Sequence, residues 1–196
     1  MDTKQKRMDE LFNQIRKCRK CALWEKARNP VPGQGDLNAS LMLIGEAPGY
    51  HEDIKGQPFV GSAGRVLDEL LMSIGIKRDE IFIANIIKHR PDENRDPSEE
   101  EIKACGPYLE HQIKIIEPRM IVTLGRYSTK YVLSKVGIEF QGISNLRGRV
   151  IEKNLFGIRL KIMPTFHPAA TLYNPKYRNF LENDFKMINR LLTEIS

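Results

Sequence analysis

The sequence predicts an α/β protein with three layers, in which a mostly parallel sheet lies between two layers of helices. Two observations lead to this prediction. Short apolar runs of strand length alternate along the chain with longer segments whose apolar residues recur at helical spacing. Loops rich in glycine, proline or asparagine follow two of the strand-like runs, at residues 90–97 and 165–175, where a parallel sheet places its functional loops.

In the first half of the chain, each expected element has a local signal. Residues 4–17 have a helical pattern, and residues 39–44 are apolar enough for a buried strand. The next helix is expected to end at Gly75, and its apolar face consists of Val66, Leu67, Leu70, Leu71 and Ile74. Residues 80–87 predict a second strand.

The second half begins with a clear helix start. Ser98 and Glu101 match a capping box, so a helix is expected from Ser98 to about Glu117. The remaining expected elements are a strand at 119–124, a helix at 128–135, a hairpin or sheet edge formed by 150–151 and 160–163, and a helix over about 176–192.

Length and composition limit the class of protein. The 196 residues fit one domain, residues 1–196, that buries its own core. The net charge of +6 favours a polyanionic partner such as nucleic acid, although a solvated basic surface would give the same total. No apolar run approaches the roughly 20 residues of a membrane span, and the N-terminus has no signal-peptide core, so a cytoplasmic protein without membrane contact is expected.

The first predicted strand ends in a motif with chemical potential. Gly45-Glu46-Ala47-Pro48-Gly49 follows it directly, and Glu52, Asp53 and the segment 58–64 come shortly after. Ligands of open α/β sheets bind outside the carboxyl ends of the strands. The run therefore predicts an active site with a carboxylate at its tip.

Two further polar residues follow other strands. Asn85 lies in or at the end of the second strand, where a buried amide needs hydrogen-bond partners, and a neighbouring loop could supply them. His167 follows residues 160–163 and precedes a proline, which suits an electrophilic or acid role as well as an ordinary polar contact. Both are expected at the same sheet edge as Glu46.

The three cysteines indicate a metal site. Cys18 and Cys21 form a Cys-x-x-Cys pair, Cys105 lies in a predicted helix, and His89 is on the loop before that helix. These four residues suit an iron–sulfur cluster or zinc. The alternative is a free thiol pair together with a Cys105 that acts as a small buried apolar residue.

Taken together, the motifs resemble the family 4 uracil-DNA glycosylases, the iron–sulfur type. The resemblance runs in order from Cys18 to Leu172, nearly the whole chain. The matching segments are residues 45–53, 56–64, Asn85-x-x-Lys88-x-Arg90-Pro91, Asn94-Arg95-Asp96-Pro97 and His167-Pro168-Ala169-Ala170.

The resemblance implies a four-stranded parallel sheet and hydrolysis of the bond between uracil and deoxyribose in DNA. It implies catalytic roles for three residues: Glu46 at the water-activating position, His167 as a donor to the uracil O2, and Asn85 as the reader of the Watson–Crick edge. Uracil would first be flipped out of the duplex.

The same resemblance implies a set of substrate-binding residues. Phe59 would stack on the flipped base, and Glu52 would help to exclude the thymine methyl group. Backbone amides of residues 61–64, Gly61 and Ser62 among them, would contact a DNA phosphate, and Leu172 would probe the minor groove. Gly45 and Ala47 belong to the same set as members of the first motif.

The chain departs from the family at one cluster ligand. The family carries four cysteines, and His89 stands here in the place of one of them. Imidazole can ligate iron, so the expected cofactor is a [4Fe–4S] cluster held by Cys18, Cys21, His89 and Cys105, with zinc or a depleted cluster as alternatives.

Two other functions remain open at this point. One is a glycosylase for a different deaminated base, and the other is an iron–sulfur DNA-binding protein that has lost the chemistry. The expected partner is uracil-containing DNA bound by a monomer, with a sliding clamp as an additional candidate partner.

Overall fold

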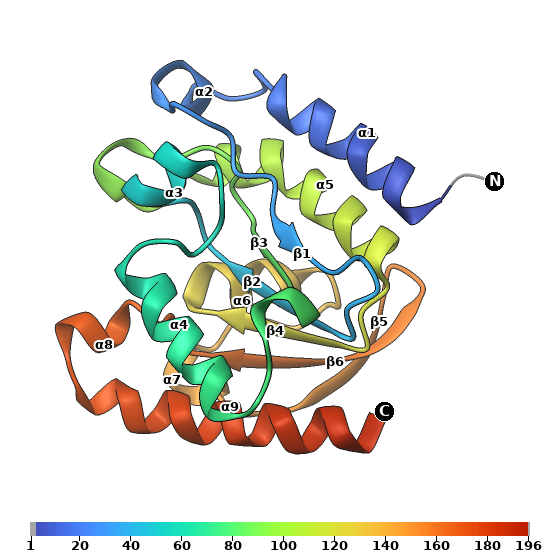
Figure 1. Ribbon diagram of the computed structural model, residues 1–196, viewed down its shortest axis with the longest axis vertical. Coiled ribbons are helices and arrows are strands. Elements are labelled where there is room, and N and C mark those ends of the chain that lie inside the picture. Colours follow the sequence, from blue (N-terminus) through green and yellow to red (C-terminus); the bar gives the residue numbers. More distant parts are fainter. Residues whose placement is uncertain (1–2, 196) are drawn as a thin grey trace.

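The computed structural model describes residues 3–195, which form a six-stranded sheet with helices on both faces (Figure 1). None of the helices in this range has the length and apolar composition needed to cross a membrane. The helices are α1 (Lys4–Arg16), α2 (Leu23–Lys26), α3 (Tyr50–Lys55), α4 (Ser62–Ser73), α5 (Glu99–Ile116), α6 (Arg126–Ser134), α7 (Ile143–Leu146), α8 (Ala170–Tyr173) and α9 (Lys176–Ile195), with short 3-10 turns at Arg78–Glu80 and Asp92–Asn94. The strands are β1 (Gln34–Gly35), β2 (Leu41–Gly45), β3 (Phe82–Asn85), β4 (Met120–Leu124), β5 (Ile151–Leu155) and β6 (Ile158–Thr165).

The strand order is β1-β3-β2-β4-β6-β5. The four central strands are parallel to one another, and β1 and β5 pair antiparallel at the two edges. The expectation of four strands was therefore too small, although the parallel centre is confirmed. The two residues of β1 are exposed and show no apolar alternation, so nothing in the sequence marks them as a strand.

Successive residues of the central strands face opposite layers of helices. In β2, Met42 and Ile44 pack in a core with residues of α1, α5 and α6, whereas Leu41 and Leu43 pack in a second core with residues of α4 and α9. Figure 1 shows α1 and α5 on one side of the sheet and α4 and α9 on the other. The three-layer α/β/α prediction is confirmed.

The expected helix ends are also observed, with shifts of a few residues. The Ser98 side chain accepts a hydrogen bond from the Glu101 amide at 3.2 Å, and the Glu101 carboxylate accepts one from the Ser98 amide at 2.8 Å, as a capping box requires. Gly75, just beyond α4, has a φ of +73°. The helix expected at 128–135 begins earlier, at Arg126. Helix α3 was not expected, because six residues are too few for a helical period to show.

Candidate active site

A cavity of about 450 Å³ lies at the carboxyl ends of the parallel strands. Glu46 follows β2, Asn85 ends β3 and His167 follows β6, and all three line this cavity. The full lining is Glu46, Ala47, Pro48, Gly49, Glu52, Phe59, Ala63, Asn85, Pro91, Asn94, Arg95, Asp96, His167, Ala169 and Tyr173. The sheet therefore brings together the three residues that the sequence placed after separate strands.

Phe59 lies in the wall of the cavity in an unusual backbone conformation. Its φ is +51°, in the left-handed region that residues with side chains seldom adopt. The Arg78 guanidinium holds this segment by donating to the carbonyl oxygens of Pro58 and Phe59. Gly64 is needed beside it, since a Cβ there would come within 1.9 Å of the Phe59 carbonyl oxygen. The fold thus maintains a strained turn that presents an aromatic ring, which is typical of a binding site.

Asn85 is buried and its amide is incompletely paired. Only 2% of the residue is exposed, and its Oδ1 has no hydrogen-bond partner within residues 3–195. Its backbone carbonyl oxygen accepts a hydrogen bond from the buried Lys88 ammonium at 2.7 Å, which helps to fix the Asn85 backbone. Gly45 lies against it, where a Cβ would come within 2.3 Å of Oδ1. An unpaired buried acceptor costs about 1–3 kcal/mol, a cost that a ligand N–H would remove.

His167 stacks on Phe59, with ring centroids 5.5 Å apart and an interplanar angle of 27°. Its Nδ1 accepts a hydrogen bond from the Ala169 amide at 3.1 Å, so in the neutral ring the proton is on Nε2. Burial lowers the pKa of His167 to about 4, and the nearby Glu52 acts in the opposite direction. At neutral pH the ring is therefore an uncharged donor through Nε2.

Glu46 is half-buried where the chain leaves β2. Its pKa is raised to about 7, mainly by burial and also by Asp96, while Arg126 acts in the opposite direction. A carboxylate with a pKa near neutrality can take up a proton during a reaction and release it afterwards. This is the property expected of a general base.

Glu52 anchors the segment that carries Phe59. Its carboxylate accepts hydrogen bonds from the amides of Val60 and Gly61, both at 2.8 Å. The Gly61 amide is therefore occupied in this structure, and a phosphate contact at the start of α4 remains a prediction for the amides from Ser62 onward.

Some predicted site residues lie just outside the cavity lining. Gly45, Gly61, Ser62 and Leu172 are not part of it, although Gly45 touches Asn85 and Phe59 from behind. Leu172, on α8, is 52% exposed, and its neighbour Tyr173 is 88% exposed and lines the cavity. The sequence predicted no role for Tyr173, Asn94, Arg95 or Asp96, although the last three belong to the Asn94-Arg95-Asp96-Pro97 motif.

The three cysteines belong to the same apolar core and do not line the cavity. Cys105, on α5, is buried and accepts a hydrogen bond from the Lys88 amide at 3.1 Å. Cys18 and Cys21 pack against the same apolar core. Burial is the main cause that raises the pKa of Cys105 to about 12, and Cys21 and Cys18 lie near enough to contribute to the rise, whereas Lys88 opposes it.

His89 differs from the cysteines in its surroundings. It is buried; burial lowers its pKa, and the nearby Asp53 acts in the opposite direction. No three His, Cys, Asp or Glu side chains within residues 3–195 are grouped closely enough to hold a metal ion. The donor types nevertheless suit an iron–sulfur cluster or zinc, since three thiols share an apolar environment.

Comparison with known proteins identifies the family. The model of the uracil DNA glycosylase superfamily matches residues 32–193. The chain belongs to this superfamily. Within it, the chain is 47% identical to a type-4 uracil-DNA glycosylase of Saccharolobus solfataricus over 95% of this chain and 87% of the relative. Type-4 enzymes of Sulfurisphaera tokodaii and Archaeoglobus fulgidus are 48% and 44% identical, each over 94% of this chain and over 84% and 92% of the relative. The predicted family is therefore confirmed.

Proposed function

We propose that this chain is a uracil-DNA glycosylase, which hydrolyses the bond between uracil and deoxyribose and leaves an abasic site, the first step of base excision repair. The relatives that match almost the whole chain are type-4 uracil-DNA glycosylases. The observation that carries the proposal is the Oδ1 of Asn85, which has no hydrogen-bond partner in the described part of the chain and lies in the wall of a cavity that also holds Phe59 and His167.

The Asn85 amide has the polarity that uracil requires. Its Oδ1 accepts the N3–H of uracil, and its Nδ2 donates to O4. Cytosine presents an acceptor at N3 and a donor at N4, so both contacts would be reversed. Because the amide is buried, each mismatched contact leaves a polar group without a partner, and this discriminates against cytosine.

Uracil reaches this amide only after it has been flipped out of the duplex, which costs a few kcal/mol and least at a mismatch. The Phe59 ring supplies a face on which the flipped base stacks. Leu172, exposed on α8, fills the gap left in the duplex, as apolar side chains do in other minor-groove contacts.

Cleavage places negative charge on the departing uracil and positive charge on the sugar. The Nε2–H of neutral His167 donates to uracil O2 as the bond from C1′ to N1 breaks, which stabilises the uracil anion. Glu46 orients a water molecule whose oxygen bonds to C1′, and its carboxylate takes the proton that this water loses. Glu52, on the same wall, excludes the C5 methyl group of thymine.

A strand-cleavage assay tests this proposal. The protein is incubated with end-labelled oligonucleotides that contain one uracil, thymine, cytosine or hypoxanthine, and alkali then breaks any abasic site. Cleavage of the uracil strand alone supports the proposal, and preparations of Glu46→Gln made in parallel exclude a contaminating glycosylase. Cleavage only at hypoxanthine, or DNA binding without cleavage, would contradict it.

The proposal includes a cluster site in which Cys18, Cys21 and Cys105 supply thiolates and His89 supplies an imidazole. When bound, a [4Fe–4S] cluster would have a structural role as a cross-link and not a redox role, because hydrolysis transfers no electrons. These residues join the segment after α1, the loop after β3 and helix α5. The cross-link would shape a surface for DNA at a distance from the uracil cavity.

Loss of the cluster is expected to weaken DNA binding before it changes the uracil cavity. His89→Ala is expected to lower iron and sulfide content and to raise the Kd for abasic-site DNA. His89→Cys, which supplies a fourth thiolate, is expected to keep the wild-type cluster content and the wild-type Kd. Elemental analysis and fluorescence anisotropy measure the two quantities. Unchanged DNA affinity in cluster-free protein would refute this role. If elemental analysis finds zinc and no iron, the metal of the site is zinc.

A further inference from the structure

Glu46 follows β2, and the segments that follow the two flanking strands, β3 and β4, carry the two charged residues of interest. Strand β2 pairs with β3 on one side and β4 on the other, and Ile44 of β2 lies opposite Thr123 of β4. Glu46 is two residues beyond Ile44, and Arg126 is three residues beyond Thr123, at the first position of α6. Glu46 and Arg126 therefore both lie just beyond the carboxyl ends of two adjacent parallel strands.

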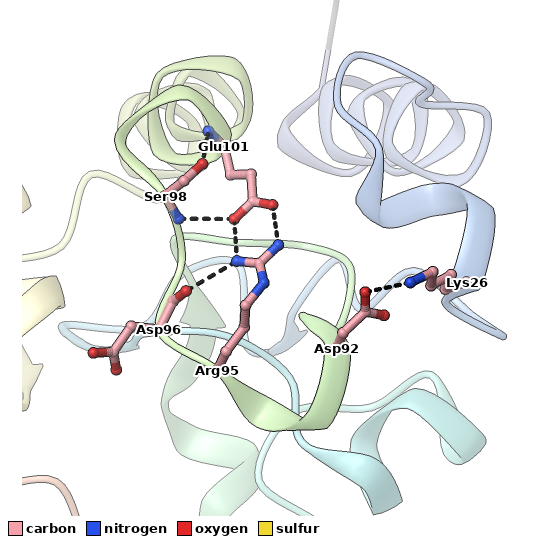
Figure 2. Close-up of polar contacts among 6 residues, drawn as sticks. All are labelled: Lys26, Asp92, Arg95, Asp96, Ser98 and Glu101. Atoms are coloured by element: carbon pink, nitrogen blue, oxygen red, sulfur yellow. Dashed lines mark hydrogen bonds and ion pairs between the residues drawn. The ribbon is translucent and has the colours of Figure 1, made fainter.

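Asp96 reaches the same place from the other neighbour, on the loop after β3. Figure 2 shows how this loop is held: Arg95 donates two hydrogen bonds to the Glu101 carboxylate, at 2.6 and 2.9 Å, and a third to the Asp96 carbonyl oxygen at 2.9 Å. In the same view the Asp96 carboxylate points away from Arg95 and Glu101. It accepts a hydrogen bond from the Arg126 guanidinium at 2.5 Å and lines the cavity that Glu46 also lines.

We propose that the Asp96–Arg126 ion pair, which joins the loops on either side of Glu46, is a positioning pair that controls the protonation of Glu46 and so sets the acid limit of uracil excision. The inference rests on the proposed function, since it assumes that ionised Glu46 activates the water. Neither Asp96 nor Arg126 has to touch the substrate for this effect.

The electrostatic environment of Glu46 agrees with this geometry. Burial has the largest effect on its pKa, Asp96 also raises it, and Arg126 lowers it. Tyr127, the next residue of α6, interacts with Asp96 and Glu46 as well, but burial raises its pKa, so it carries no charge at neutral pH. The other ionisable groups that line the cavity are Glu52, Arg95, His167 and Tyr173. Glu52 is bound to backbone amides, Arg95 is paired with Glu101, and His167 is uncharged above a pH of about 4. The ion pair therefore supplies the adjustable charge beside Glu46.

Two single variants with opposite predicted signs test the proposal. Asp96→Asn removes a negative charge, so the pKa of Glu46 is expected to fall. The acid limb of the pH profile, where the single-turnover rate declines as Glu46 becomes protonated, is then expected to move to lower pH by about half a unit, the size typical of one exposed charge. Arg126→Gln removes a positive charge, so the limb is expected to move to higher pH by a similar amount. The double variant, which lacks both charges, is expected close to the wild type.

Asp92→Asn is the matched control. Asp92 lies on the same loop and is also in an ion pair, with Lys26 at 2.7 Å (Figure 2). Unlike Asp96, it does not line the cavity. Its acid limb is expected to stay at the wild-type pH. Asp96 and Arg126 are both more than half exposed, so the single variants are expected to remain folded, and thermal melting checks this.

The rates are measured with saturating enzyme, which separates chemistry from DNA affinity. A general loosening of the loop would move both single variants in the same direction, and that result would overturn the proposal, as would the absence of any shift. If the wild type excises no uracil at all, the proposed function itself fails. If it excises uracil with an acid limb that neither single variant moves, only the role of the ion pair is refuted.

Discussion

Replacing Glu46 by glutamine is expected to slow uracil excision by about 10²- to 10⁴-fold, the range that general acid–base groups contribute. Glutamine retains the shape of the side chain but cannot take the proton from the attacking water. The single-turnover rate on uracil-containing DNA measures the effect. Binding of abasic-site DNA is expected to persist, because Glu46 is placed for the chemistry and not for contact with the duplex.

The pH dependence of excision provides a second measure of the same role. Glu46 must be ionised to act, and its pKa is raised to about 7, so the wild-type rate is expected to increase with pH up to about 7 and to level off above it. The residual rate of Glu46→Gln should lack this limb. A wild-type rate in this variant, or a limb that survives the substitution, would assign water activation to another group.

Substitution of His167 by alanine is expected to lower the excision rate by about 10²- to 10³-fold, the loss typical of one preorganised donor to a developing anion. The donor is the Nε2–H of a ring that is neutral at physiological pH, because its pKa is lowered to about 4. His167 should therefore add no limb to the rate profile between pH 5 and pH 9. The rate at saturating enzyme measures the loss.

Two further substitutions separate hydrogen bonding from packing at His167. His167→Phe retains an aromatic ring against Phe59 but has no N–H, whereas His167→Asn retains an N–H and loses the ring. Recovery of activity in the asparagine variant is expected. If the phenylalanine variant recovered instead, the ring would act by packing and the proposed stabilisation of uracil O2 would be wrong.

The choice of candidate site residues came from local patterns in the sequence. Glu46, Asn85 and His167 each follow or end an apolar run, and parallel strands bring their carboxyl ends to one edge of the sheet. Likewise, the start of α5 was predictable because a capping box involves only residues three apart. Such signals survive in the folded protein because neighbouring residues in the chain stay neighbours in space.

The sequence by itself thus determined the layered α/β architecture, the order of its main elements and the residue types at the sheet edge. The tertiary structure decided the edge strand β1, the left-handed turn at Phe59, the unpaired oxygen of Asn85 and the Asp96–Arg126 pair beside Glu46. Each of these depends on contacts between segments far apart in the chain. Burial, unpaired polar atoms and local charge depend on all the neighbours of a residue in space, so the residue pattern of one segment does not predict them.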